Sequence, residues 1–309
     1  MFDLVALQAA VRAHGRVARV VIAGFEGSAP REVGAAMLVW ATGQSGTIGG
    51  GALEWQAVQK ARALLPSRTA HLARIPLGPA LGQCCGGAVT LLTEIYGAEA
   101  LHLEGPVIAR PVDGSPMPLA VKRLIATARG QGILPAPHLL QGWMVEPVLR
   151  PDRELWVWGA GHVGRAITAV MAPLPGLRVT WVDVAPSRFP EVVPEGVRLL
   201  PVPDPANAVT LAAQTAEHLI LTFSHNLDLE LCHHLLIHGF SGCGLIGSAT
   251  KWARFRSRLT ALGHTPTEIS KITCPIGDPA LGKHPQAIAL GVAAEFLRER
   301  QTAHLRQKL

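Results

Sequence analysis

Two adjacent cysteines, Cys84 and Cys85, lie between glycines in the stretch Leu81–Gly87. A cysteine thiol becomes a nucleophile or a soft-metal ligand once its pKa falls, and neighbouring glycines let the backbone turn tightly and come close to a ligand. A second glycine cluster, Gly46–Gly51, lies upstream. We interpret the two stretches as the walls of one site. Two tight turns that carry buried, inert thiols would explain the same pattern.

Two cations lie next to loop-forming residues. Arg31 follows Ser28-Ala29-Pro30, and its planar guanidinium could hold an anionic oxygen through two hydrogen bonds. Lys251 follows the Gly247-Ser248 turn and could act in the same way. For each, the alternative is an ordinary surface cation.

A cysteine nucleophile would need a base, and two histidines are placed at the tips of expected loops. His162 lies inside a glycine loop and His225 follows an expected strand. Loops at strand ends are where α/β domains place ligand-binding groups, although a solvated loop histidine is an equal alternative. Zinc is poorly supported, because the cluster Cys232–His238 offers two ligands on one helix face whereas structural zinc needs four.

The elements that position these residues are clearest in the C-terminal half. An expected strand at residues 154–158 runs into the glycine loop Gly159–Gly164, a helix, and a second strand at 178–182 that ends on Asp183. This order matches the dinucleotide-binding fingerprint, in which the helix N-terminus takes a phosphate. We predict the fold from it, and not nucleotide binding, because function does not follow from fold.

The rest of the chain predicts an α/β protein of two domains. We expect an N-terminal α/β domain over residues 1–105, a proline-rich connector over 106–150, and a Rossmann-like doubly wound parallel sheet over 151–309. Expected strands cover residues 17–23, 35–40, 88–96, 218–223 and 244–247, and expected helices cover 3–14, 52–65, 119–129 and 285–300.

Composition narrows the function classes. The 309 residues are 49% hydrophobic and 16% charged, as in a globular protein, and the net charge of +6 favours anionic partners. The basic run at residues 251–258 is explained more simply as a solvated helix face than as a nucleic-acid patch. No apolar run is long enough for a membrane helix, and no signal peptide is recognised. Five cysteines without a spacing framework favour a reducing, cytoplasmic location.

Taken together, the motifs resemble the XdhC/CoxI family, the accessory proteins of xanthine dehydrogenase maturation. The resemblance covers nearly the whole chain and is weakest over residues 106–150. One departure is Asp278-Pro279 after Cys274–Gly277, where the family usually has an apolar residue. The matching stretches are Gly27–Arg31 with Gly34-Ala35, Gly46–Glu54, Gly82–Gly87, Gly159–Val163, Val182-Asp183, His225 with Asp228, Gly244–Ser248 with Lys251, and Cys274–Gly277.

The resemblance implies a cytoplasmic chaperone for the molybdenum cofactor (molybdopterin) rather than an enzyme. Its implied partners are the molybdenum-binding subunit of xanthine dehydrogenase and a NifS-like cysteine desulfurase, with no nucleic acid and no membrane; a homodimer is compatible with it. No catalytic residue is expected, and Cys85 is the expected metal ligand. The expected cofactor-binding residues are Cys85, Cys84, Arg31, Gly49, Gly50, Gly51, Gly86, Gly87, Gly159, Gly161, His162 and His225.

Two other functions stay open. An NAD(P)-dependent oxidoreductase would rest on Gly159–Gly164 and Asp183, although the resemblance outweighs that fingerprint and we do not expect NAD(P) as a cofactor. A scaffold that only binds other proteins would need no cofactor of its own.

Overall fold

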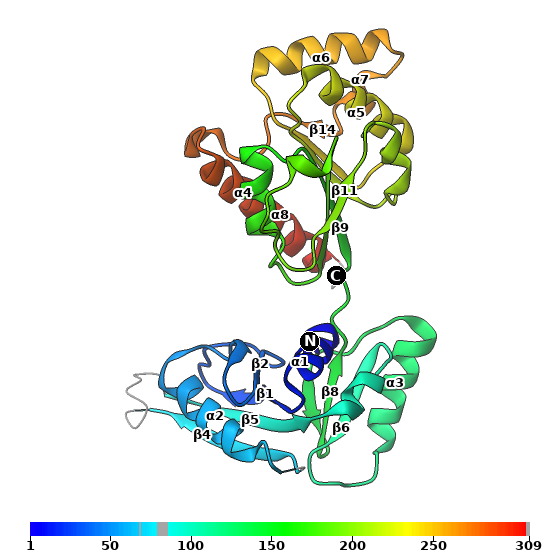
Figure 1. Cartoon of the computed structure of the whole chain (residues 1–309). Helices are drawn as coiled ribbons and strands as arrows, with labels where there is room; N and C mark the ends of the chain where they lie inside the picture. The colour runs from blue at the N-terminus through cyan, green and yellow to red at the C-terminus, as the bar shows by residue number, and fades with distance from the viewer. Residues whose placement is uncertain (68, 79–85, 307–309) are drawn as a thin grey trace. The chain divides into compact units, whose positions relative to one another are not determined.

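The computed structural model describes residues 1–67, 69–78 and 86–306, and side chains up to residue 298. Cys84 and Cys85 therefore lie outside the described residues. The chain divides into two compact units, Met1–Arg150 and Pro151–Leu309 (Figure 1). Each unit has its own sheets and its own hydrophobic core, and the two are described separately.

The first unit is built on a five-stranded antiparallel sheet in the order β3-β2-β1-β5-β4. The central strand β1 pairs with β2 on one side and with β5 on the other, and its register shifts between Ile22 and Gly24. The strands are β1 (Val17–Glu26), β2 (Ala36–Val39), β3 (Gln44–Gly46), β4 (His71–Leu77) and β5 (Gly87–Tyr96).

Helix α2 (Gly51–Leu64) covers one face of this sheet (Figure 1). Its apolar stripe, which includes Leu53, Ala57 and Val58, is buried in one cluster with apolar side chains of β1, as its helical spacing predicts. The helix ends at Leu64, two residues before Pro66, which has no backbone N–H to continue the helical hydrogen bonds. Burial of this stripe fixes the start of α2, and with it the glycine cluster that leads into the helix.

Residues 106–150, expected to be a connector with one helix at 119–129, carry a small sheet as well as that helix. Strands β6 (Val107–Pro111), β7 (His138–Leu140) and β8 (Trp143–Pro147) form an antiparallel sheet in the order β6-β8-β7, and α3 (Leu119–Gln131) packs beside it. Met144 lies in one cluster with Val21 and Ala23, so this sheet covers the face of β1 opposite α2. Helix α1 (Leu4–His14) and the 3-10 helix η2 (Ala98–His102) pack together at the end of the main sheet.

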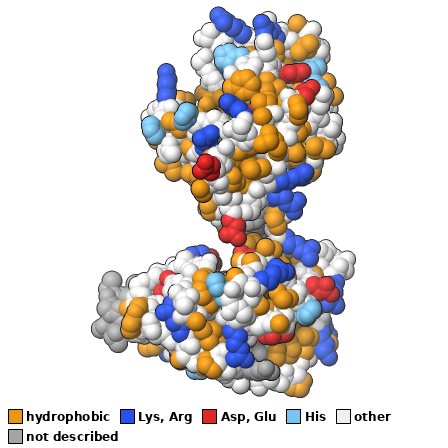
Figure 2. Space-filling view, in the orientation of Figure 1, with side chains coloured by type: hydrophobic (Ala, Val, Ile, Leu, Met, Phe, Trp, Pro, Cys, Tyr) orange, Lys and Arg blue, Asp and Glu red, His pale blue; other side chains and the backbone are white. Residues whose placement is uncertain are grey.

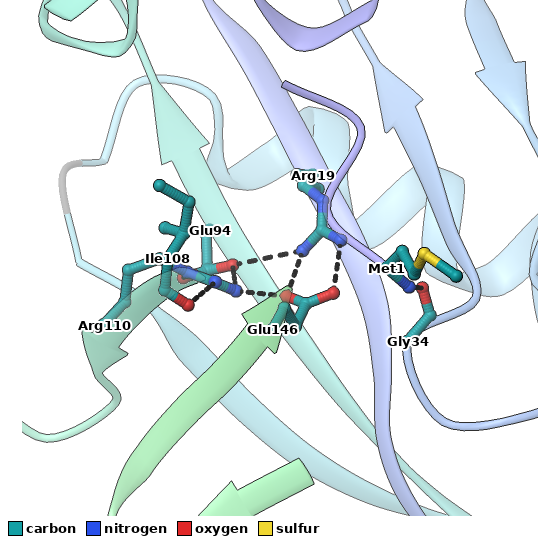
Figure 3. Close-up of polar contacts among 7 residues, drawn as sticks. All are labelled: Met1, Arg19, Gly34, Glu94, Ile108, Arg110 and Glu146. Atoms are coloured by element: carbon teal, nitrogen blue, oxygen red, sulfur yellow. Dashed lines mark hydrogen bonds and ion pairs between the residues drawn. The ribbon is translucent and has the colours of Figure 1, made fainter. Parts of the chain in front are cut away.

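A buried ionic network joins the two sheets of the first unit (Figure 3). Arg19 donates to both carboxylate oxygens of Glu146, at 2.9 and 2.7 Å. Arg110 donates to both oxygens of Glu94, at 2.7 and 2.8 Å, and to Glu146 at 2.6 Å. The two guanidinium groups also lie over the ring of Phe2. Four charges can be buried here because two cations meet two anions.

The second unit has a parallel six-stranded sheet in the order β11-β10-β9-β12-β13-β14. Counted within the unit, this is the 3-2-1-4-5-6 order of doubly wound dinucleotide-binding sheets, which confirms the expected Rossmann-like fold. The strands are β9 (Arg153–Trp158), β10 (Leu177–Asp183), β11 (Arg198–Pro201), β12 (Glu217–Ile220), β13 (Gly242–Leu245) and β14 (Ile272–Thr273). Strand β12 ends at Ile220, three residues before the expected end at 223.

Helices cover both faces of this sheet (Figure 1). Helices α4 and α8 pack with each other on one face, and α5, α6 and α7 contribute to the core on the other. Short 3-10 helices lie in the connections. The helices are α4 (His162–Met171), α5 (His225–His238), α6 (Ala249–Ala261), α7 (Pro266–Ile269) and α8 (Pro285–Arg306), and the 3-10 helices are η3 (Pro186–Arg188), η4 (Asn207–Leu211) and η5 (Pro279–Leu281).

Many of the basic side chains that give the chain its positive net charge lie on the surface. Figure 2 shows Lys and Arg side chains spread over the visible face of both units. On α6, Arg254, Arg256 and Arg258 are exposed, as expected for a solvated basic face. Within the described part of the chain, no helix is both long enough and apolar enough to span a membrane.

Candidate functional site

The loop after β1 touches both glycine clusters of the first unit. A Cβ atom added to Gly27 would lie 3.2 Å from the Cα of Gly87, next to the Cys-Cys stretch. A Cβ atom added to Gly49 would lie 2.5 Å from Pro30 and 3.6 Å from the Cγ of Arg31. The contact at Gly49 leaves no room for a side chain, and the contact at Gly27 is tight. The structure thus brings Arg31, Gly49 and Gly87, which are far apart in the sequence, to one end of the main sheet.

The surface beside these contacts is open. A Cβ atom placed on Gly50, Gly51 or Gly86 would meet no other atom within 4 Å. The backbone φ angles of Gly49, Gly50 and Gly51 are 123°, 75° and 64°, a left-handed region that glycine adopts without a side-chain clash. The backbone here can therefore be approached closely by a ligand.

Glu54, in the first turn of α2, binds the glycine cluster through its carboxylate. Oε2 accepts hydrogen bonds from the Thr47 hydroxyl at 2.5 Å and from the backbone N–H groups of Ile48 and Gly50 at 3.0 and 3.1 Å. Oε1 accepts from the Gln44 side chain at 3.2 Å. Partial burial acts to raise the pKa of Glu54, but these hydrogen bonds together outweigh it, so the pKa lies below the usual value. The carboxylate is ionised at neutral pH.

Arg31 is 40% exposed and pairs with its neighbour, Glu32. Its Nε and Nη2 donate to the two carboxylate oxygens of Glu32 at 3.1 and 3.0 Å. The hydrogen bond from Arg31 lowers the pKa of Glu32. An exposed ion pair of this kind contributes little to stability, so an incoming anion can compete with Glu32 for the guanidinium.

Three cysteines belong to the described residues. Cys232 and Cys243 are buried, and burial raises the pKa of both thiols, so neither is a reactive thiolate. Cys274 is half-buried, and burial also raises its pKa, although Lys251 acts in the opposite direction. The remaining candidates for a reactive thiol are Cys84 and Cys85.

In the second unit, the acidic residue of the fingerprint is turned toward the protein. Asp183 is buried, and its Oδ2 accepts a hydrogen bond from the backbone N–H of Ala160 at 2.6 Å. Its Oδ1 accepts from the Val184 N–H at 2.7 Å and from the Arg188 side chain at 3.3 Å. Both carboxylate oxygens are thus engaged in holding the glycine loop and the turn after β10.

His162 and His225 occupy equivalent positions at the carboxyl edge of this sheet. They are the first residues of α4 and α5, which follow the neighbouring strands β9 and β12, and both side chains are exposed. Gly161 is the N-cap residue of α4, and a Cβ atom placed on it would meet no other atom within 4 Å. Gly159 has a φ of 120° and packs against Leu221. This edge offers open backbone at α4 and two imidazole rings.

The contacts of Lys251 differ from both of the roles that the sequence indicated for it. Its Nζ donates to Oδ2 of Asp228 at 2.6 Å and to the carbonyl oxygen of Ile246 at 2.9 Å, and its side chain is only 11% exposed. Asp228 also accepts from the N–H and the hydroxyl of Thr222. Lys251 therefore links α6 to α5 inside the protein. It is neither a surface cation nor a cation that is free to hold an anion.

The described residues contain no group of three or more His, Cys, Asp or Glu side chains that could hold a metal ion. A hydrogen bond links His233 Nδ1 and His264 Nε2 at 2.7 Å, which joins α5 to the loop before α7.

Two family models match the chain. The model of the XdhC and CoxI family matches residues 10–76, and the model of the XdhC Rossmann domain matches residues 155–296. These segments contain the loop after β1 with the first glycine cluster, and most of the parallel sheet.

One related protein and one solved structure cover almost the whole chain. The uncharacterized protein YqeB of Escherichia coli (strain K12) is 26% identical over 288 residues, which is 91% of this chain and 43% of YqeB, so the chain spans less than half the length of that relative. A crystal structure described as a xanthine dehydrogenase from Bacillus halodurans has a TM-score of 0.72 and 18% identity, and covers 97% of this chain and 96% of that one. At this identity the likeness shows the fold alone.

Proposed function

The chain belongs to the XdhC and CoxI family, and we propose that it binds the molybdenum cofactor as cargo and delivers it to xanthine dehydrogenase. Family membership indicates an accessory role in the maturation of that enzyme. The proposal adds that the chain protects the cofactor, supports its sulfuration and performs no turnover of its own.

The observation that carries the proposal is that the loop after β1 carries Arg31 and contacts both Gly49 and Gly87, at one end of the main sheet of the first unit. A partly exposed guanidinium is a group that binds the phosphate of an anionic pterin, and glycine backbone without side chains lets that phosphate approach closely. The open positions at Gly50, Gly51 and Gly86 leave space for a ligand beside them. The residues present therefore fit a phosphate-bearing cargo.

Cys85, with Cys84 as the second candidate, is the proposed thiolate ligand of the molybdenum. Both lie outside the described residues, next to Gly86 and Gly87 in the sequence. Thiolate is a soft ligand suited to transition metals, and the cargo itself supplies the redox chemistry that the acceptor enzyme uses. Gly87, two residues after Cys85 in the sequence, begins β5 and contacts the loop after β1, which carries Arg31.

The proposed partners follow from this role. The molybdenum-binding subunit of xanthine dehydrogenase would receive the cofactor, and a NifS-like cysteine desulfurase would supply the sulfur. We propose a cytoplasmic location, and a homodimer is compatible with the role. In the second unit, Gly159, Gly161, His162 and His225 are the proposed contacts for cargo or partner at the carboxyl edge of the sheet.

The alternative, an NAD(P)-dependent oxidoreductase, finds less support. In a nucleotide-binding site of this fold, the acid at the end of the second strand binds the ribose hydroxyls. Here both carboxylate oxygens of Asp183 are engaged with Ala160, Val184 and Arg188. The fingerprint is present, but its acidic residue binds groups of the protein itself.

Gene deletion in the source organism tests the proposal. Xanthine dehydrogenase from the deleted cells should be folded and contain its other redox centres but lack active molybdenum cofactor. In a second measurement, the full chain purified from a cofactor-producing host should carry pterin and molybdenum. A fully active dehydrogenase from the deleted cells would refute the chaperone role, and cofactor-free protein from that host would refute cargo binding.

A further inference from the structure

Three consecutive glycines, Gly49, Gly50 and Gly51, hold left-handed backbone angles immediately before and at the start of α2. Glycine loses more conformational freedom on ordering than any other residue. An ordered run of three therefore needs specific contacts that hold it in place.

Those contacts converge on one side chain. The Oε2 atom of Glu54 accepts from the Thr47 hydroxyl and from the N–H groups of Ile48 and Gly50, so one oxygen fixes both sides of the turn. The backbone at Glu54 is held in place, because its neighbour Leu53 on the same helix is fully buried. The glycine cluster is thus tied to a rigid helix through a single carboxylate.

The opposite side of the same loop has no protein contact at two positions. A Cβ atom on Gly50 or Gly51 would meet nothing within 4 Å, whereas Gly49 packs on Pro30 beside Arg31. A loop that is held firmly from one side and left open on the other is suited to receive a ligand against its backbone. The carboxylate also occupies the Ile48 and Gly50 amides, so a bound anion must use other donors. Arg31 is one such donor, because its Cγ would lie 3.6 Å from a Cβ atom added to Gly49.

We propose that Glu54 is a positioning residue for a phosphate-bearing cargo: without touching the cargo, it holds the glycine cluster in the shape that accepts it. This inference rests on the proposed function of the same site. Glu54 lies outside the set of residues for which sequence reasoning predicted a binding role.

The Glu54→Gln variant tests the proposal in the full chain, produced in a cofactor-producing host. The amide keeps the size of the side chain but replaces one acceptor oxygen with an N–H₂ donor, which faces the donors of the loop. The exposed Glu104→Gln is the matched control in the same unit. We expect pterin per folded molecule to fall at least about fivefold in Glu54→Gln, the effect of losing one hydrogen bond or more, and to stay unchanged in the control.

A purely structural role would lower the melting temperature without lowering the pterin content of the molecules that remain folded. Amide hydrogen exchange of residues 46–51, measured without cargo, reports whether Glu54 orders the loop, and faster exchange is expected in Glu54→Gln. Equal pterin content in wild type and Glu54→Gln, or equal exchange, overturns the role of Glu54. Wild-type protein without any pterin refutes the proposed function instead, and the exchange measurement then still decides whether Glu54 holds the loop.

Discussion

The backbone nitrogen of Ala160 lies 2.6 Å from Oδ2 of Asp183, so the glycine loop of the second unit is bonded to the acid that would otherwise bind a ribose. Trp181 adds a second bond to the same loop, from its indole Nε1 to the carbonyl oxygen of Gly159 at 3.0 Å. The glycine loop and the acidic residue of the fingerprint are therefore hydrogen-bonded to each other. It accounts for a parallel sheet of this order without requiring a dinucleotide.

Calorimetric titration with NAD and NADP should show no binding tighter than about 1 mM, or about −4 kcal/mol. The reason is that Asp183 is buried and both of its carboxylate oxygens already accept hydrogen bonds from the protein, so a ribose hydroxyl would have to displace protein groups to reach it. Micromolar binding of either nucleotide would contradict this. Asp183→Asn is the control, and we expect it to lower the melting temperature while leaving the titration flat.

The main features of the second unit could be predicted because its signals are local. A strand, Gly159–Gly164, a helix and a strand ending on Asp183 follow one another within a short stretch, and the parallel fold follows from that order. Over residues 106–150, only the helix at 119–129 was predicted. Their small sheet pairs β6 with β8 across the whole of α3, and the spacing of the prolines concealed it.

The ionic network of the first unit was also invisible in the sequence, and it makes a strong prediction. Arg19 is 2% exposed and Glu146 is 0% exposed, so removing one charge leaves another buried without its partner. We expect Arg19→Met to reduce the free energy of unfolding by about 3–5 kcal/mol. Chemical denaturation of the full chain measures this, and a loss below about 1 kcal/mol would show that water reaches the network.

The double variant Arg19→Met/Glu146→Leu is the matched comparison. It removes one cation and one anion and leaves Arg110 bonded to Glu94 through both carboxylate oxygens. Because no uncompensated charge remains, we expect it to be more stable than Arg19→Met alone. If the double variant were the less stable of the two, desolvated charge would not be the cause of the single variant's loss.

His218 predicts a pH dependence of stability. Its Nδ1 accepts from Trp158 Nε1 at 3.1 Å, and burial, with a smaller effect of His238, lowers its pKa to about 3. Between this value and the ordinary pKa of about 6.5, the unfolded chain binds a proton that the folded chain excludes. Stability contributed by the neutral ring is therefore complete above pH 6.5 and falls as the pH is lowered, by about 1.4 kcal/mol per pH unit.

The measurement is the free energy of unfolding from pH 7 to pH 5 in wild type and in His218→Gln. The slope in the variant should be shallower by the amount given above, whereas the exposed His102→Gln should keep the wild-type slope. Parallel curves for wild type and His218→Gln would mean that the ring is protonated within the fold.

Sequence reasoning found the glycines of the candidate site and missed the residues that hold them. A close contact such as that of Gly49 admits no side chain, so the position has to be a glycine and can be recognised in the sequence. Sequence reasoning gave Glu54 no role of its own, and it included Lys251 in a solvated basic face. Which side chain fills a helix–loop corner depends on tertiary packing, as the bond from Lys251 to buried Asp228 shows.

The sharpest test of the site concerns Cys85. It precedes Gly86 and Gly87, so a ligand can approach its side chain without crowding from the next two residues. We predict that Cys85→Ala stays folded, with a stability change of about 1 kcal/mol, but copurifies with much less molybdenum cofactor than wild type, because alanine offers no soft ligand.

Cys232→Ala is the matched control for this experiment, since it removes the same atom from a thiol that is fully buried in the core of the second unit. It should keep the wild-type cofactor content while losing some stability to the small cavity that it leaves. Cofactor content and melting temperature are measured side by side on both variants. Unchanged cofactor in Cys85→Ala would mean that this thiol is an inert part of a turn, and would transfer the proposed role to Cys84. A fall in cofactor that appears equally in Cys232→Ala would show that the loss follows stability rather than ligation, because the buried thiol of Cys232, with its raised pKa, cannot reach a ligand as a thiolate.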